Sequence, residues 1–97
     1  MPRPKMCRRV GQMPHSNFFK PAGVRMHKLD YSILTLGEFE ALRLNDLEEL
    51  DQNDAADKMN ISQPTFHRLV KLARKKVADA IVNGKAIKIE GGNFKLK

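Results

Sequence analysis

Apolar residues recur every three to four positions in the middle of the chain, and this period predicts a mainly α-helical protein. Three residues suited to cap a helix N-terminus open three such stretches: Thr35, Asp51 and Ser62. The stretches end at about Asp46, at Asn60 and at Gly84. The sequence therefore predicts three consecutive helices within residues 34–84.

The first and third of these helices carry the fullest boundary signals. Glu38 follows Thr35 by three positions, which is the spacing of a capping box. Pro64 falls in the first turn of the third helix, where its missing N–H costs nothing. Gly84 is typical of the residue that ends a helix in the left-handed conformation. We expect the third helix to run from the Ser62 cap to about Asn83.

The second and third expected helices meet the steric needs of a helix-turn-helix. Small Ala56 stands where the two helices would cross closely, and Asn60 tolerates the left-handed turn between them. Apolar residues occupy the inward positions around that turn: Ala55, Met59, Ile61, Phe66 and Leu69. Because the second helix of this motif enters the DNA major groove, the segment 62–76 is the expected recognition helix.

The two ends of the chain have different patterns. Four of the five prolines lie in the first 21 residues, so residues 1–33 are predicted to form an extended basic arm with one short strand around Cys7–Val10. We expect Phe18, Phe19 and Val24 to hold this arm on the core. Residues 85–97 are predicted to form a β-hairpin around Gly91 and Gly92. In that register Ile89 faces Phe94, Ile87 faces Leu96, and Lys88 faces Lys95.

Length and composition exclude several classes of protein. A chain of 97 residues is expected to form one domain, and no run of ~20 apolar residues is long enough to span a membrane. The single cysteine fits a cytoplasmic location. The net charge of +7 is segregated: residues 1–28 hold seven basic and no acidic side chains, residues 29–60 two basic and nine acidic, and residues 61–97 nine basic and two acidic. Such blocks fit a polyanion partner with a distinct water-facing acidic side, and they fit a solvated surface of uneven composition equally well.

The outward positions of the third helix carry the candidate DNA contacts. None of them is acidic before Asp79. Gln63, His67, Arg68 and Thr65 are expected to contact base edges. Ser62, Lys71, Arg74, Lys75 and Lys76 are expected to contact phosphates, and Pro64 lies among them in the first turn. Secondary contacts are expected from the arm residues Arg3, Lys5, Arg8 and Arg9 and from the hairpin residues Lys88 and Lys95.

Residues 34–77, from Leu-Thr-Leu-Gly-Glu-Phe-Glu to Ala-Arg-Lys-Lys-Val, resemble region 4 of bacterial sigma factors. By this resemblance Gln63, Pro64, Thr65, His67 and Arg68 match positions that face promoter DNA, although Pro64 stands where a charged side chain is usual. The whole chain resembles a small uncharacterised prokaryotic family described as predicted DNA-binding proteins. The resemblance rests on the opening Met-Pro-Arg-Pro-Lys, the central Phe-Lys-Pro-Ala-Gly-Val and the closing Gly-Lys-Ala-Ile-Lys-Ile-Glu-Gly-Gly.

These observations predict a sequence-specific double-stranded DNA-binding protein, a transcriptional regulator that acts as a homodimer. A dimer is expected because one short recognition helix rarely supplies enough specificity alone, and the hairpin face or the arm is its expected contact. No enzymatic activity, cofactor or metal is expected, since Cys7, His15 and His27 match no zinc signature. The alternative is a protein-interaction adaptor whose sigma-like core docks on another protein. RNA binding is disfavoured by the scarcity of aromatic residues.

Overall fold

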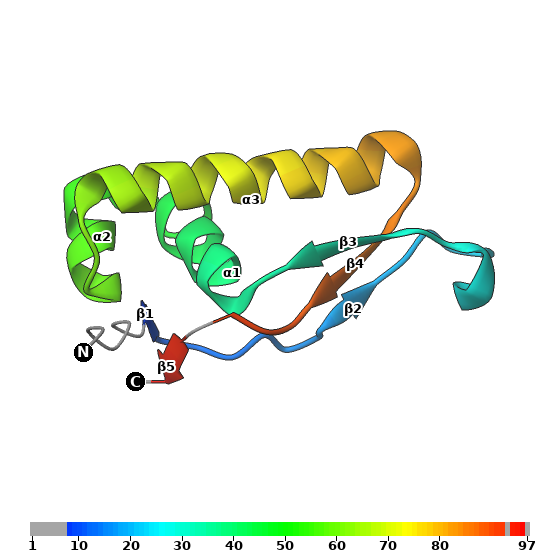
Figure 1. The fold of residues 1–97 in the computed structure, drawn as a ribbon, viewed down its shortest axis with the longest axis horizontal. Coiled ribbons are helices and arrows are strands. Elements are labelled where there is room, and N and C mark those ends of the chain that lie inside the picture. The colour runs from blue at the N-terminus through cyan, green and yellow to red at the C-terminus, as the bar shows by residue number, and fades with distance from the viewer. Residues whose placement is uncertain (1–7, 93, 97) are drawn as a thin grey trace, which may run out of the picture.

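A computed structural model describes residues 8–92 and 94–96, with side chains described for residues 8–92. In Figure 1 the longest helix, α3, lies along one side of the molecule, and the other two helices and the strands lie on its other side. No helix of this described part is long and apolar enough to cross a membrane.

The elements in chain order are β1 (Arg8–Val10), β2 (Phe18–Phe19), the 3-10 turn η1 (Met26–Lys28), β3 (Tyr31–Leu34), α1 (Leu36–Leu42), the π-helical segment η2 (Arg43–Leu47), α2 (Gln52–Met59), α3 (Gln63–Asn83), β4 (Ala86–Ile89) and β5 (Phe94–Leu96).

The helix starts are confirmed by the capping hydrogen bonds. The backbone N–H of Glu38 donates to Oγ1 of Thr35 at 3.2 Å, and the backbone N–H of Thr35 donates to Oε1 of Glu38 at 2.8 Å, so the capping box is complete. The carboxylate of Asp51 and the hydroxyl of Ser62 accept from the backbone N–H three residues on. These bonds satisfy donors that the first turn of a helix leaves without a partner.

The helix ends are confirmed by two residues in the left-handed conformation. Asn60 has φ 58° and ends α2, and Gly84 has φ 66° and ends α3 directly after Asn83. The first helix differs from the expectation of one regular helix to Asp46. It is α-helical only to Leu42 and continues as the π-helical η2, which the apolar period did not indicate.

Two apolar clusters form the core. The first lies where α1, η2, α2 and α3 meet, and it contains all five apolar residues expected around the turn: Ala55, Met59, Phe66 and Leu69 are buried and Ile61 packs against them at half burial. The second cluster joins the strands to the helices through Val10, Leu34, Leu36, Ala73 and Ile89. The helix-turn-helix packing that the sequence predicted is therefore present.

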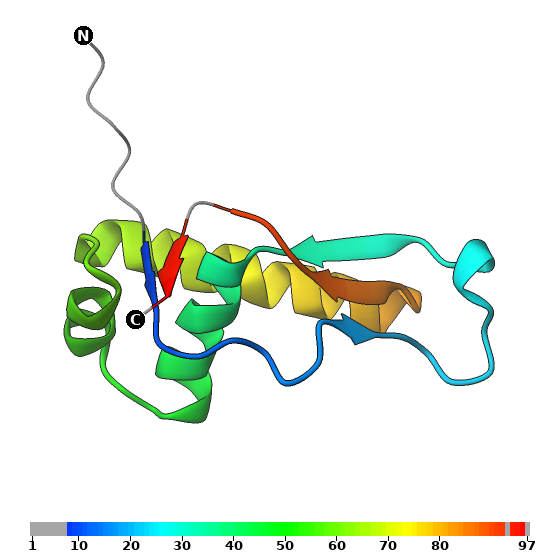
Figure 2. The same ribbon diagram turned by 90° about the horizontal axis from the view of Figure 1, so that it is seen from below.

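The strands form two small sheets that join the ends of the chain. In the three-stranded sheet β4 lies in the middle, antiparallel to β2 and parallel to β3, and in the two-stranded sheet β1 and β5 are parallel. Figure 2, which views the molecule from below, shows β3, β4 and β2 side by side in front of α3, and β5 beside β1. The strand expected around Cys7–Val10 is present as β1.

The predicted C-terminal hairpin is wrong. Gly91 and Gly92 do adopt positive φ, 76° and 88°, but the chain does not fold back there. Ile87 aligns with Phe19 and Ser32, and Lys88 with Phe18 and Ile33, so neither residue faces β5. A two-stranded hairpin is marginal on its own, whereas a central position pairs both edges of β4 and buries Ile89 in the second cluster.

The N-terminal segment is attached to the core mainly through Val10, and less through the expected residues Phe18, Phe19 and Val24. Val10 is fully buried, whereas Phe18 and Val24 are half-buried and Phe19 is 52% exposed. The Phe18 and Tyr31 rings instead form a T-shaped contact with a centroid distance of 5.9 Å. The basic segment is thus attached mainly through β1 and its pairing with β5.

Candidate nucleic-acid interface

The N-terminal half of α3 presents most of the candidate DNA-contacting residues on its uncovered side. Arg68, Lys71 and Lys75 are exposed, and their spacing of three and four residues aligns them along one face of the helix. The side opposite them is buried against the first apolar cluster. Exposed positions also include Ser62, Gln63, Pro64, His67 and Arg74, whereas Thr65 is half-buried.

Arg68 is hydrogen-bonded to a hydroxyl group of the first turn of α3. Oγ of Ser62 donates to Oγ1 of Thr65 at 2.9 Å, and Nη2 of Arg68 donates to the same Oγ1 at 3.4 Å. The Thr65 hydroxyl therefore positions the guanidinium of Arg68 beside the helix N-terminus. A guanidinium at this end of the helix suits a bidentate contact to guanine or to a phosphate.

His67 contacts α2 through a residue that the sequence reasoning missed. Nε2 of Gln52, at the first position of α2, lies 3.3 Å from Nδ1 of His67. A donated bond from the Gln52 amide leaves Nε2 of His67 as the nitrogen that carries the hydrogen and faces solvent. No local pattern indicates this contact, because it joins residues of two helices that are fifteen positions apart.

Arg74 is already paired within the protein. Its Nε and Nη2 donate to the two carboxylate oxygens of Asp46 at 3.0 and 2.5 Å, which links α3 to η2. The hydrogen bonds from Arg74 lower the pKa of the Asp46 carboxyl, and the hydrogen bond to Asp46 raises the pKa of Arg74. Both side chains remain partly exposed, so the pair is a weak one that a phosphate can compete for.

Lys76 does not lie on the exposed face, contrary to the expectation of a phosphate contact. Its Nζ lies 2.7 Å from Oε1 of Glu38 in α1, and its side chain is half-buried. Lys76 follows Ala73 by three residues and precedes Ala80 by four, and both alanines are buried. That spacing turns Lys76 toward the core flank of the helix, so it is a structural cation.

The acidic residues of segment 29–60 do not all face water, contrary to the expectation. Glu38 and Glu40 are 2% exposed, and each is paired with a basic side chain. Arg43 donates from Nε and Nη2 to Glu40 at 2.7 and 2.8 Å and also pairs with Glu48. Oε2 of Glu40 additionally accepts the backbone N–H of Gly11 at 2.8 Å. Glu40 thereby holds Gly11 of the N-terminal segment on α1, and the hydrogen bond to Glu40 raises the pKa of Arg43.

The expected secondary contacts are dispersed over the molecule. Arg8 and Arg9 are half-buried in β1. The Cδ atom of Arg8 packs against Gly37, and a Cβ atom added to residue 37 would lie 3.1 Å from that Cδ atom. Lys88 pairs with Glu90 at 2.9 Å in the sheet, and this hydrogen bond raises the pKa of Lys88. The Arg3 and Lys5 predictions, and that for the side chain of Lys95, lie outside the described residues.

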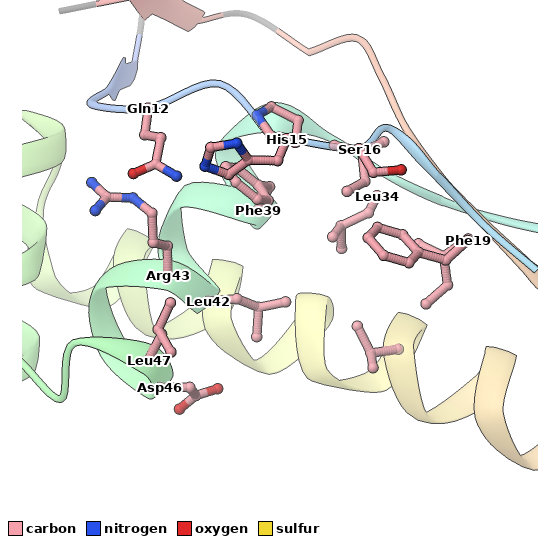
Figure 3. Close-up of a pocket in the computed structure, with 14 residues that line it drawn as sticks. Gln12, His15, Ser16, Phe19, Leu34, Phe39, Leu42, Arg43, Asp46 and Leu47 are labelled. Carbon is pink, nitrogen blue, oxygen red and sulfur yellow. The ribbon is translucent and has the colours of Figure 1, made fainter.

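A separate apolar pocket of about 690 Å³ lies between α1, α3, β4 and the segment that follows β1. Figure 3 shows Gln12 and His15 above, Phe39 next to His15, Leu42 and Leu47 below, and Phe19 at the right. Asp46, which holds Arg74, also lines it. Among the described residues no three His, Cys, Asp or Glu side chains are grouped as metal ligands.

Comparison with known proteins places the whole chain in one group of relatives. Residues 1–97 match the family model described as "Protein of unknown function DUF134". The chain is 56% identical over 96 residues to a UPF0251 protein of Thermoanaerobacter sp. strain X514, covering 99% of this chain and 85% of that relative. It is 53% identical to a UPF0251 protein of Pelotomaculum thermopropionicum, covering 99% and 73%. No solved structure matches the chain with statistical significance.

Proposed function

The chain belongs to the family of unknown function DUF134, and we propose that it binds double-stranded DNA in a sequence-specific manner through the outward face of α3. The helix-turn-helix formed by α2 and α3 is the framework of this proposal. The protein then acts as a transcriptional regulator in the cytoplasm and reads its site as a homodimer. The expected likeness to sigma region 4 is compatible with this role.

One observation carries the proposal: three cations on the uncovered face of α3 form no salt bridge with a described residue. Arg68, Lys71 and Lys75 are exposed and take part in no salt bridge of that part of the chain, whereas Arg43, Arg74 and Lys76 are all paired. Unpaired cations aligned on one face are what phosphate binding uses, because each releases a condensed counterion from the duplex.

The first turn supplies the groups suited to bases. Arg68, held by Thr65, fits the N7 and O6 acceptors of guanine, and Gln63 is suited to adenine. His67, supported by Gln52, offers one further hydrogen bond at the same end of α3. Lys71 and Lys75 lie one and two turns farther along, where they fit phosphates. Arg74 contributes less than these lysines because Asp46 partly neutralises it.

The test is the salt dependence of duplex binding, measured by fluorescence anisotropy with a random-sequence duplex. The two phosphate contacts, from Lys71 and Lys75, predict a fall in affinity of roughly 12-fold between about 50 and 200 mM salt for each subunit bound. Lys71→Ala should weaken binding and reduce the slope of log affinity against log salt by about one. The matched control is Lys20→Ala, because Lys20 is exposed next to β2, in the strand layer, and its Nζ donates to the carbonyl of Val24.

Two results would overturn the proposal. Duplex affinity that does not change with salt would exclude the phosphate contacts. Absence of duplex binding even at low salt would leave the adaptor hypothesis, in which the helix-turn-helix docks on another protein.

A further inference from the structure

Strand β3 lies at an open edge of the three-stranded sheet. Its one neighbour among the described strands is β4. The carbonyls of Asp30 and Leu34 accept from Ala86 and Glu90 at 2.9 and 3.0 Å, so the even-numbered residues direct their backbone groups at β4. In a parallel ladder the alternate residues direct theirs the opposite way. The N–H and C=O groups of Tyr31 and Ile33 therefore point to the open edge.

This edge lacks the usual protection against pairing with another chain. The strand Tyr31–Leu34 holds no charge, no proline and no glycine, and such features are what normally blunt an edge strand. Tyr31 is 44% exposed and Ile33 is 49% exposed, on the face of the sheet opposite to buried Ser32 and Leu34. Figure 2 shows β3 as the outer strand of the sheet with no other element beyond it.

We propose that β3 pairs antiparallel with β3 of a second copy of this chain about a two-fold axis at Ser32. The outward backbone groups restrict the hydrogen-bonded pairs to odd-numbered residues, because both partners must point at each other, and an axis at Ser32 pairs Tyr31 and Ile33 at once. Tyr31 then faces Ile33 of the partner subunit, and Ile33 faces Tyr31 of the partner subunit. An aromatic residue opposite a β-branched one is a favourable cross-strand pair, and Asp30 meets Leu34 of the partner subunit, so no like charges face each other.

The geometry of this dimer matches a duplex. Paired side chains share one face, so the two-fold axis is perpendicular to the sheet and both α3 helices lie on the same side of it. Oγ of Ser32 donates to the carbonyl of Lys76 at 2.9 Å, which puts the axis level with Lys76. Thr65 lies eleven residues earlier, about 16 Å at ~1.5 Å per residue. The two first turns are thus about 33 Å apart along the helix direction, close to the ~34–36 Å of one DNA turn. Only this last step rests on the proposed function.

Sedimentation velocity of the full chain without DNA tests the interface. The wild type should sediment as a dimer at about 10–50 μM. Ile33→Lys places a charge in the pair with Tyr31 of the partner subunit and should raise the dimer dissociation constant at least tenfold. The matched control is Ile81→Lys, because Ile81 is 74% exposed on α3 and away from β3. Ile33→Pro is a second variant, since it removes an N–H that points away from β4. Thermal unfolding by circular dichroism checks that each variant is folded.

A monomeric wild type at these concentrations would overturn the interface, and so would a dimer that Ile33→Lys and Ile33→Pro both leave intact. DNA results bear on the two proposals separately. If the wild type is a dimer, both variants are monomers and the wild type binds no duplex, the interface is supported and the proposed function is overturned. Duplex binding by a protein that is monomeric without DNA supports the proposed function and overturns the interface.

Discussion

Oε1 of Glu38 accepts the backbone N–H of Thr35 at 2.8 Å and pairs with Nζ of Lys76 at 2.7 Å, so one carboxylate oxygen both caps α1 and binds the middle of α3. The Glu38 side chain is 3% exposed. A buried carboxylate needs such partners, because desolvation is unfavourable for an unpaired charge. This contact fixes α3 relative to α1, and thereby fixes the direction of the proposed recognition face.

The same substitution at two neighbouring lysines of α3 is expected to change the stability to very different extents. Lys76→Ala leaves the Glu38 carboxylate buried without its cation and should lower the free energy of unfolding by about 2–3 kcal/mol. Lys75→Ala removes an exposed side chain and should change it by less than ~0.5 kcal/mol. Urea unfolding measures both, and equal losses of stability in the two variants would contradict the placement of Lys76.

The Asp46–Arg74 pair gives a pH-dependent contribution to stability. Hydrogen bonds from Arg74 lower the pKa of Asp46 below its unfolded value of ~3.9. A lowered carboxyl pKa stabilises the fold above the unfolded pKa, and this stabilisation is lost as the pH falls through the folded pKa. The wild type should exceed Asp46→Asn in stability by less than ~1 kcal/mol at neutral pH, because the pair is exposed. Thermal unfolding from neutral pH to below about pH 3 should show this difference disappear, and a difference that instead grew in acid would contradict the pairing.

The same substitution should have the opposite effect on duplex binding. Asp46→Asn removes a negative charge close to α3 and releases Arg74 for a phosphate. Affinity for a random duplex at low salt should rise several-fold, and the salt slope should steepen by up to about one. Anisotropy titrations measure both quantities. Asp57→Asn is the control, because Asp57 is exposed on α2 and forms no salt bridge with a described residue. Weaker binding by Asp46→Asn would show that Arg74 does not contact DNA.

The turn of the helix-turn-helix rests on one residue with positive φ. Asn60 has φ 58° and ψ 44°, which glycine adopts without strain and alanine does not. Asn60→Ala should therefore lower the free energy of unfolding by about 1 kcal/mol, whereas Asn60→Gly should be nearly neutral. Chemical denaturation distinguishes them, and equal destabilisation would indicate that the Asn60 side chain, not its backbone conformation, matters.

The helical part of the fold was predictable because its signals are local. The caps Thr35, Asp51 and Ser62 and the stop at Gly84 each act within one helical turn, and the structure confirms them. The burial of Lys76 was also present in the sequence, in its spacing from Ala73 and Ala80. The outward-face prediction missed it because a charged residue was assumed to be exposed.

The strand pairing was not predictable in the same way. Gly91 and Gly92 have the backbone conformations that a hairpin needs, yet β4 pairs with Phe18–Phe19 and with Tyr31–Leu34, dozens of residues away. Pairing partners depend on which distant apolar faces need covering, and no local pattern encodes that choice. The link between Gln52 and His67 was missed for a related reason, since it joins two helices across the turn.

The central claim is that the first turn of α3 reads bases while its later cations hold phosphates. The most direct measurement first selects the duplex that the wild type prefers from a random pool. The affinities for this duplex and for an unrelated duplex are then compared for the wild type, Arg68→Ala and Lys75→Ala. Arg68→Ala should reduce the ratio of the two affinities by about 5- to 150-fold, the value of one bidentate base contact. Lys75→Ala should weaken both duplexes alike and leave the ratio unchanged. A ratio that changes equally in both variants, or in neither, would contradict the account.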